Sequence, residues 1–296
     1  MNRIAAINLI IFAAIVVIAA VCNSCKSRGS SEVKSLESVV LENINTEENE
    51  SIAAETEAAM NCPDTEYTEN NGVKLPEKII SEDGSITKFE YDDKNRLVKI
   101  FVCDNGELMG TFTITYNGND LVSYALSYDD DFSYYWGDVP DMSAQRRGNT
   151  IYVNEGGVKH TINVNDEGYI VDYKTEHPMA GVSVKNYQYV DNKLFRIIED
   201  GWVRELRYDN EKSPFYNSNT PKWFMQFRFF DFALNNNVTA WKIVEGSTDH
   251  QYEYENEYIY DNEGFPTKQT KTEKTMYDNE EGYVSTKITY FYYRGQ

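Results

Sequence analysis

The side chains that most often carry catalysis or bind metals are scattered along this sequence. Its three histidines are His160, His177 and His250, and no two of them have the spacing of a metal site. Aspartates and glutamates number 48, so some pair will lie close together in any fold, and closeness alone does not indicate glycoside hydrolysis. Motifs of serine hydrolases, zinc proteases, P-loop proteins and dinucleotide-binding proteins are absent from the sequence. We therefore predict no catalytic residue, no metal and no cofactor.

The N-terminus has the pattern of an export signal. Arg3 is followed by an almost entirely apolar run from Ile4 to Val21, which then meets Cys22 and Cys25. We predict a signal peptide over residues 1–24. The run is also long enough for an uncleaved membrane anchor, which stays an alternative.

The two cysteines after this run suggest how the mature chain is anchored. The segment Ala19-Ala20-Val21-Cys22-Asn23-Ser24-Cys25 resembles the lipobox of bacterial lipoproteins, in which a small residue precedes the cysteine that is lipidated. Ser24 is small and fits before Cys25, whereas Val21 fits poorly before Cys22. The resemblance implies lipidation at Cys25, with Cys22 as the alternative, and attachment to a membrane through acyl chains.

The remaining cysteines are Cys62 and Cys103. An exported protein meets an oxidising compartment, where a disulfide between them is allowed. Alternatively, Cys103 packs as a small apolar residue and stays a free thiol.

Composition and charge divide the chain after the signal peptide. Residues 25–72 are acidic, rich in Ser, Asn, Glu and Thr, and poor in aromatic residues, which predicts a flexible tether. Residues 73–296 hold most of the aromatic residues and form the predicted folded domain. The whole chain has a net charge of −20, which disfavours nucleic-acid partners because the protein surface would repel phosphate.

The domain shows the alternation of an antiparallel β-sheet. Apolar and polar residues alternate over 86–91, 96–102 and 108–116, and turn residues such as Asp104-Asn105-Gly106 separate these runs. Strand ends recur in which an aromatic or apolar residue precedes an Asp/Asn turn. They begin at Tyr91, Tyr116, Val164, Tyr189, Tyr208, Tyr260 and Tyr277. We predict an all-β fold, an antiparallel meander that forms a barrel or a strongly curled sheet.

Several segments resemble known sequences. Phe89-Glu90-Tyr91-Asp92-Asp93-Lys94-Asn95-Arg96-Leu97 resembles a divergent YD (RHS-type) repeat, with Asn95 in the place of the usual Gly. The segments at 74–79, 213–216, 235–239 and 258–268 resemble the DUF4595 family of Bacteroidales lipoproteins, which has a porin-like fold and no known function. The resemblance implies an envelope protein with an antiparallel barrel. Surface lipoproteins of this group resemble one another in having acidic residues after the lipidated cysteine. Here Lys26-Ser27-Arg28-Gly29 follows, which favours the periplasmic face of the outer membrane over the cell surface.

An aromatic segment between Pro221 and Asn235 interrupts the alternation. We predict a short helix or loop near 221–235 that plugs or caps the sheet. Four tryptophans could also stack on a ligand, although each could instead fill the core; they are Trp136, Trp202, Trp223 and Trp241.

Two functional hypotheses follow, with a third that the pattern disfavours. The first is an envelope-anchored binding or scaffold module whose partner is a glycan or an envelope protein. The second is a secreted glycan-active hydrolase, which would need two carboxyl groups about 5–10 Å apart in a concave site. A membrane-spanning barrel is disfavoured because charged residues such as Lys88 and Glu90 interrupt the face that would meet lipid.

Overall fold

The computed structural model describes residues 62–63, 72–127, 141–199, 201–230, 235–245, 250–277 and 280–294. These residues form an all-β barrel of sixteen strands with one short helix, α5 (Lys222–Arg228). The strands are β1 (Leu75–Ser81), β2 (Ile86–Tyr91), β3 (Leu97–Asp104), β4 (Glu107–Asn117), β5 (Asp120–Ser127), β6 (Met142–Arg147), β7 (Thr150–Glu155), β8 (Val158–Val164), β9 (Ile170–His177), β10 (Gly181–Val190), β11 (Lys193–Glu199), β12 (Trp202–Lys212), β13 (Asn236–Glu245), β14 (His250–Tyr260), β15 (Pro266–Tyr277) and β16 (Glu280–Arg294).

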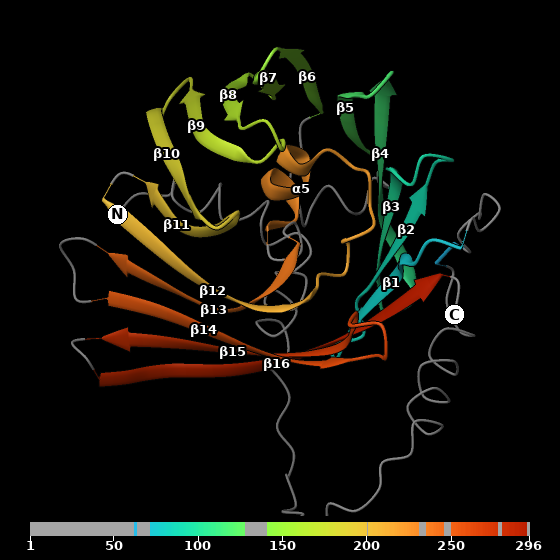
Figure 1. Ribbon diagram of the computed structural model, residues 1–296, viewed down its shortest axis with the longest axis vertical. Helices are drawn as coiled ribbons and strands as arrows, with labels where there is room; N and C mark the ends of the chain where they lie inside the picture. The colour runs from blue at the N-terminus through green and yellow to red at the C-terminus, as the bar shows by residue number, and fades with distance from the viewer. Residues whose placement is uncertain are drawn as a thin grey trace, which may run out of the picture.

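The strands form a simple closed meander. Each pairs antiparallel with the next, and the ring closes where β1 pairs with β16, with Ile79 opposite Phe291 (Figure 1). The predicted antiparallel meander is confirmed, and of its two predicted forms the closed barrel is the one that occurs. Closure gives every strand a partner on both sides, but two of the pairings are short. β5 and β6 pair only at Ser123–Ser143 and Tyr124–Met142, and the pairing of β11 with β12 ends at Arg196–Glu205.

The period-two alternation sets which side chains face the interior. In β7, Ile151 and Val153 are buried in the core, whereas Tyr152 and Asn154 are exposed. Successive side chains of a strand point to opposite faces, so one face of this strand packs inward and the other meets solvent.

Three five-residue turns share one geometry; they span residues 92–96, 165–169 and 261–265. In each, the side-chain oxygen of the first residue accepts hydrogen bonds from the backbone N–H groups two and four residues later. The fourth residue has a positive φ and is Asn95 (61°), Gly168 (87°) or Gly264 (81°). Asn and Gly tolerate this conformation best, which explains how Asn95 can replace Gly in the YD-like segment.

These three turns lie at one end of the barrel, which we call the Asx end. Each follows an even-numbered strand, and the turns of an antiparallel meander alternate between the two ends. By the same rule, all but one of the recurring strand ends belong to the Asx end; the exception is Tyr277, which ends β15. The repeat in the sequence therefore marks one rim of the barrel, because the chain returns to that rim after every second strand.

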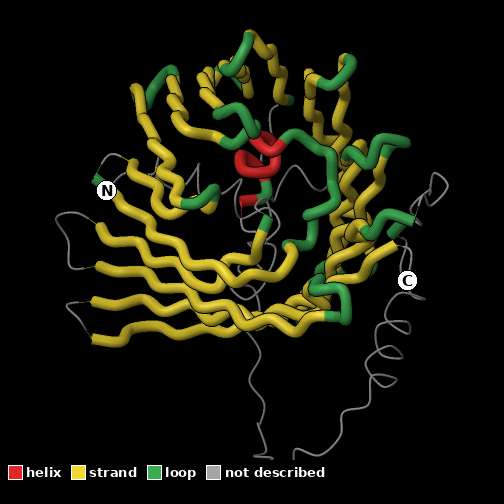
Figure 2. Tube along the Cα trace, viewed as in Figure 1, coloured by secondary structure: helices red, strands yellow, loops and turns green. Residues whose placement is uncertain are grey.

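The connection from β12 to β13 enters the barrel interior. Figure 2 shows α5 and the loop before it inside the ring of strands. From opposite parts of the wall, Phe89 of β2 packs edge-on against Phe215, and the N–H of Ile170 in β9 donates to Gln226 Oε1 at 2.7 Å. We call residues 213–230 the plug. The predicted insertion near 221–235 is thus confirmed as a short helix that plugs the barrel.

The plug completes two apolar cores. The larger one joins strands β1–β9 and β16 to α5, with Phe224 fully buried, and the smaller one joins Tyr169 and strands β11–β13 to Phe230. Burial of one such side chain contributes roughly 1.5–3 kcal/mol. Because Trp223, Phe224 and Met225 are all buried, α5 is apolar around most of its circumference, as expected of a helix enclosed by protein.

The outer wall carries ion pairs along the stretch from β9 to β14. Exposed ion pairs join Lys174 to Glu176 on β9, Arg196 of β11 to Glu205 of β12, and Lys242 of β13 to Glu253 of β14. Each pair occupies the face opposite to core residues such as Tyr173, Ile197 and Trp241. No helix in the described part of the chain is long and apolar enough to cross a membrane.

A short N-terminal piece is fixed to this outer wall. Cys62 forms a disulfide with Cys103 of β3, and the two sulfurs are buried with Ile86. Lys88 Nζ donates to the Pro63 carbonyl at 3.2 Å. Residues 62–63 belong to the segment predicted as a tether, and the structure holds them against β2 and β3.

Candidate functional site

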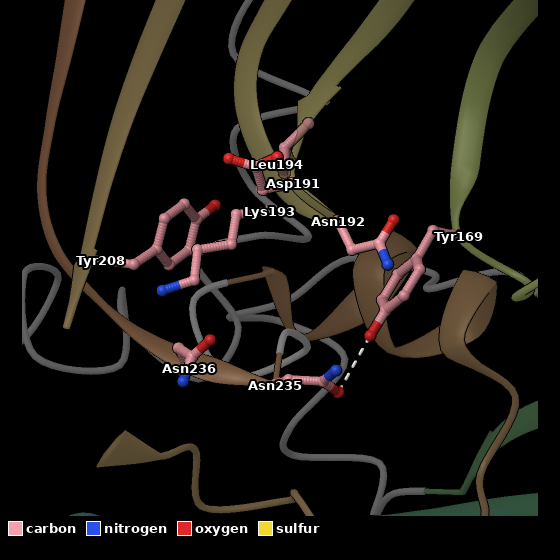
Figure 3. A pocket seen from close by; sticks show the side chains of 8 residues that line it. All are labelled: Tyr169, Asp191, Asn192, Lys193, Leu194, Tyr208, Asn235 and Asn236. Atoms are coloured by element: carbon pink, nitrogen blue, oxygen red, sulfur yellow. Dashed lines mark hydrogen bonds between the residues drawn. The ribbon is translucent and has the colours of Figure 1, made fainter. Parts of the chain in front are cut away.

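A pocket lies at the Asx end, between the start of β9, the β10–β11 turn, the end of β12 and the start of β13 (Figure 3). The cavity volume that water can enter is about 100 Å³, which is enough for several water molecules. Its lining combines two aromatic rings with amide, carboxylate and aliphatic groups, from Tyr169, Asp191, Asn192, Lys193, Leu194, Tyr208, Asn235 and Asn236.

The base of the pocket is rigid. Leu194 is fully buried, Tyr169 is 2% exposed, and the Tyr169 hydroxyl donates to Asn235 Oδ1 at 2.9 Å. Lys222 Nζ lies 4.2 Å from the centroid of the Tyr169 ring. Burial raises the pKa of Tyr169 to about 12, so its hydroxyl stays protonated at neutral pH and keeps its role as a donor.

The rim is set by a tight turn. Asp191 and Asn192 have φ values of 50° and 60°, the positive values of a two-residue hairpin turn of type I′. Lys193 Nζ donates to the Asp209 carbonyl at 3.1 Å and to Asn210 Oδ1 at 3.2 Å. One carboxylate and one ammonium therefore line the pocket, and their formal charges cancel.

Beside the pocket, a network around Asp209 fixes the end of β12. Asp209 Oδ1 accepts the N–H of Glu211 and the N–H of Asn237, each at 3.1 Å. The hydroxyl of Tyr260 donates to Asp209 Oδ2. Burial and the adjacent Asp209 carboxylate raise the pKa of Tyr260, which keeps this donor protonated. Tyr208, next to Asp209, is thereby held in place at the pocket wall.

A second polar cluster is buried where the plug meets the wall. Arg228 Nη2 of α5 lies 2.5 Å from Glu155 Oε1 in β7, and His160 Nε2 lies 3.7 Å from Glu155 Oε2. The ring of His160 also contacts Tyr173, whose hydroxyl lies 2.8 Å from His160 Nδ1. His160 is 4% exposed. A closed cluster of this kind holds the plug and offers no entrance for a ligand.

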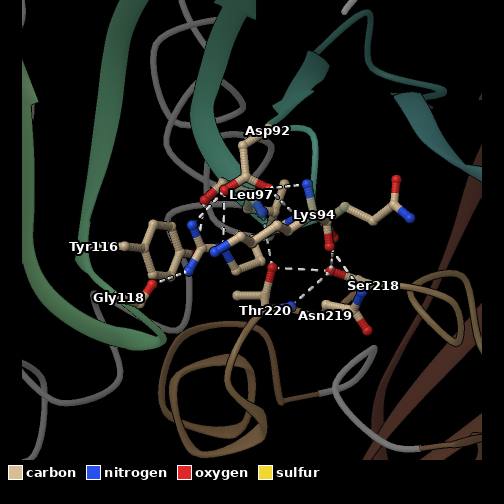
Figure 4. Close-up of polar contacts among 10 residues, drawn as sticks. Asp92, Lys94, Leu97, Tyr116, Gly118, Ser218, Asn219 and Thr220 are labelled. Atoms are coloured by element: carbon tan, nitrogen blue, oxygen red, sulfur yellow. Dashed lines mark hydrogen bonds and ion pairs between the residues drawn. The ribbon is translucent and has the colours of Figure 1, made fainter. Parts of the chain in front are cut away.

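A third cluster joins the plug to the β2–β3 turn (Figure 4). Arg96 forms a two-pronged ion pair with Asp92, at 2.8 and 2.6 Å, and lies over the Tyr116 ring at 4.0 Å. Thr220 Oγ1 accepts the N–H of Leu97 at 2.8 Å. These groups satisfy one another, so the Asp92 cluster is structural.

Four side chains form a stacked column across neighbouring strands. The Trp241 and Tyr254 rings stack with centroids 3.7 Å apart, the Arg204 guanidinium lies 4.5 Å from the Trp241 centroid, and Lys271 Nζ lies 4.3 Å from the Tyr254 centroid. Both faces of Trp241 are therefore covered by protein groups.

The predicted stacking tryptophans do not share one exposed face. Trp223 is 3% exposed in the larger core, Trp241 is 9% exposed in the smaller core, and Trp202 is 36% exposed at the opposite end of β12. Trp136 and the two candidate lipidation residues, Cys22 and Cys25, lie outside the described residues.

Neither His177 nor the acidic turn at Asp261 belongs to a described site, and the side chain of His250 and the turn at 278–279 lie outside what the structure describes. His177 Nδ1 accepts backbone N–H groups of Met179 and Ala180 at 3.1 Å, within the turn after β9. Within the described ranges, no group of three or more His, Cys, Asp and Glu side chains could hold a metal ion. The carboxylate of Asp261 forms an ion pair with Lys74 Nζ at 2.6 Å.

Sequence reasoning identified the turn at 191–192 but not the pocket beside it. The signal that could have found it is the repeat itself, because the segments at 165–169, 189–192 and 208–209 all return to the same rim. What the spacing does not reveal is that Asn235 and Asn236, at the start of β13, lie beside them.

The fold and this site together define a closed barrel with an internal plug and a polar pocket at one rim. No protein-family model matches the chain, and no curated protein is significantly similar to it in sequence. Its neighbours among solved structures include a porin-like protein from Bacteroides uniformis, with a TM-score of 0.36 and 14% identity over 75% of this chain and 95% of that chain. Another is a porin-like protein from Bacteroides vulgatus, with a TM-score of 0.33 and 11% identity over 76% of this chain and 100% of that one. Scores at this level do not by themselves establish a shared fold, so the barrel rests on its own strand pairing, and the DUF4595 resemblance stays a prediction.

Proposed function

We propose that this chain is an envelope-anchored lipoprotein whose barrel is a binding or scaffold module. In this proposal, Cys25, or alternatively Cys22, carries the lipid, and the barrel stands on the periplasmic face of the outer membrane. The resemblance to DUF4595 lipoproteins agrees with this placement.

The charged outer wall is the observation that carries the proposal. A barrel that spans a membrane presents an unbroken apolar band to lipid. Here the ion pairs Lys174–Glu176, Arg196–Glu205 and Lys242–Glu253 occupy outward faces along the stretch of wall from β9 to β14. An ion pair of this kind would lose its hydration in hydrocarbon, so the wall supports a barrel surrounded by water.

The plug argues against a role of the barrel as an open channel for ions or solutes. It contacts the wall from several sides, through the Phe89–Phe215 contact, the Ile170–Gln226 hydrogen bond and the Arg228–Glu155 ion pair. If Arg228 left with the plug, the Glu155 carboxylate would stay inside the barrel without its cation; a buried charge left unpaired costs about 3–5 kcal/mol, so displacement of the plug is unfavourable.

The pocket at the Asx end favours binding over hydrolysis. Of the two carboxylates that a glycosidase needs, its lining supplies one, Asp191. The disulfide between Cys62 and Cys103 agrees with an oxidising compartment such as the periplasm.

Cross-linking in the intact envelope, followed by mass spectrometry, tests the binding role. We expect cross-links to a partner to map to the barrel, residues 73–296, and to be sparse in residues 25–61. Cross-links concentrated in the acidic segment, or none at all to any envelope component, would contradict the proposal.

The anchor has its own test in the same cells. Cys25→Ala should block lipidation and leave a larger precursor, whereas Cys22→Ala should mature normally. The mass of the purified protein distinguishes these results, and normal acylation of the Cys25→Ala variant would exclude Cys25 as the anchor.

A further inference from the structure

The pocket at the Asx end has a lining suited to hydroxyl groups. Its amides come from Asn192, Asn235 and Asn236. Asn235 Oδ1 already accepts the Tyr169 hydroxyl, and Asn236 Nδ2 already donates to the Glu211 carbonyl. An amide has two donor hydrogens and two acceptor lone pairs, so each of the three can still donate and accept a hydrogen bond. A sugar hydroxyl has the same double capacity, whereas a carboxylate or phosphate only accepts. The lining thus matches a neutral polyol better than an ion.

The charges around the pocket also favour a neutral ligand. Asp191 and Lys193 cancel within the lining, and the Lys193 ammonium already donates to the Asp209 carbonyl and to Asn210. The whole chain carries a net charge of −20, which repels anionic ligands. An acidic ligand would therefore meet no unengaged lysine in this lining and would approach an acidic protein.

The arrangement of the lining suits the edge of a sugar ring. The half-buried ring of Tyr208 stands at one wall and Asn192 stands on the rim across from Asn235 and Asn236 (Figure 3). An aromatic face next to hydrogen-bonding groups suits a sugar ring, which has apolar C–H faces and a polar edge.

From these observations we propose that the pocket at the Asx end binds one residue of a neutral saccharide. This inference rests on the proposed function as a binding module and names its ligand class. In the bound state, Asn192 and Asn236 hydrogen-bond sugar hydroxyls, and the Tyr208 ring packs against a C–H face of the sugar.

The turn geometry offers a clean variant and a matched control. Asn192→Gly removes the amide but keeps the positive φ of 60°, because Gly adopts this conformation without strain. Asn105→Gly makes the same change in the β3–β4 turn, where Asn105 is exposed with φ 47° at the opposite end of the barrel. The two variants should unfold at similar temperatures.

The experiment is a calorimetric titration of the purified full-length protein with a panel of neutral gluco-, manno-, galacto- and xylo-oligosaccharides, with oligogalacturonate as an acidic probe and a mixed hexapeptide pool as a peptide probe. We expect a neutral member to bind, Asn192→Gly to weaken that binding about five- to ten-fold, and Asn105→Gly to leave it unchanged. Tyr208→Leu, which removes the ring but keeps an apolar side chain, should weaken it as well.

Other outcomes overturn the proposal. Binding that Asn192→Gly and Tyr208→Leu leave intact would place the saccharide elsewhere, and binding of only the acidic or the peptide probe would give the wrong ligand class. If no neutral probe binds while cross-links in the envelope still map to the barrel, the ligand class is wrong and the binding role survives. If the cross-links also fail, the proposed function fails with it.

Discussion

Arg228 of the plug and Glu155 of β7 form an ion pair inside the barrel, with Nη2 and Oε1 2.5 Å apart and both side chains buried. The pair joins two parts of the chain 73 residues apart. It lies beside His160 and under the ring of Phe227, so neither charge can be rehydrated while the plug is in place.

Arg228→Ala should destabilise the barrel strongly, by about 3–5 kcal/mol, because it leaves the Glu155 carboxylate buried without its cation. Arg196→Ala is the matched control, since it breaks an exposed pair with Glu205 on the outer wall and should cost about 0–1 kcal/mol. Urea unfolding monitored by tryptophan fluorescence measures both. Equal small losses would mean that the buried pair does not hold the plug.

Acid should weaken the fold through Glu155. Burial alone would raise the pKa of its carboxyl, but the neighbouring His160 and the Arg228 guanidinium lower it by more, so the pKa lies below its ordinary 4.5. Arg228 is the stronger partner, because His160 Nε2 at 3.7 Å is beyond hydrogen-bond distance. With a lowered pKa in the folded state, the stabilisation is fully present above pH 4.5 and is lost as the pH falls through the folded-state value.

The test compares unfolding free energies at several pH values between about 6 and 3 for the wild type and Glu155→Gln. The wild type should lose stability more steeply below pH 4.5 than the variant, which has no carboxyl to titrate at this position. Parallel pH profiles would show that Glu155 makes no such contribution.

Removal of the disulfide between Cys62 and Cys103 should lower the free energy of unfolding. The bridge spans 41 residues, and closure of a loop of this size contributes about 2–4 kcal/mol. The Cys62→Ser/Cys103→Ser double variant should therefore unfold at lower urea than the oxidised wild type. Reductant should lower the urea midpoint of the wild type towards that of the variant and leave the midpoint of the variant unchanged. If neither the double substitution nor the reductant lowers the midpoint, the two thiols are not paired in the folded protein.

Gly264 should be intolerant of a side chain because of its backbone conformation. Its φ of +81° is strained for any residue with a Cβ. Glu211 Oε2, 2.5 Å from where a Cβ would lie, is the end of an exposed, flexible side chain that can move aside. We expect Gly264→Val to lower the melting temperature about as much as Gly168→Val, whose φ is +87° in open space. Equal melting temperatures for wild type and Gly264→Val would contradict this.

The strands and turns were predictable because their signals are local. Asp92 and Asn95 fix a turn through contacts within five residues, and alternation shows which face of each strand is buried. The plug contacts and the pocket depend on distant pairs, such as Leu97 with Thr220 and Tyr169 with Asn235, which are 123 and 66 residues apart. No periodicity encodes such pairs, and for the same reason the sequence could not show that Trp223 and Trp241 are core residues.

The central claim is that the barrel stands outside the lipid and is held to the membrane only by its lipidated N-terminus. The most direct test substitutes both candidate anchor cysteines and replaces the signal peptide that precedes them. A Cys22→Ala/Cys25→Ala double variant, exported with a cleavable signal peptide in place of residues 1–24, is fractionated without detergent. The charged outer wall predicts that this variant is recovered folded in the soluble periplasmic fraction, while the wild type stays with the membrane. Recovery of the folded variant in the outer membrane, resistant to extraction at high pH, would show that the barrel itself inserts into lipid and would contradict the claim.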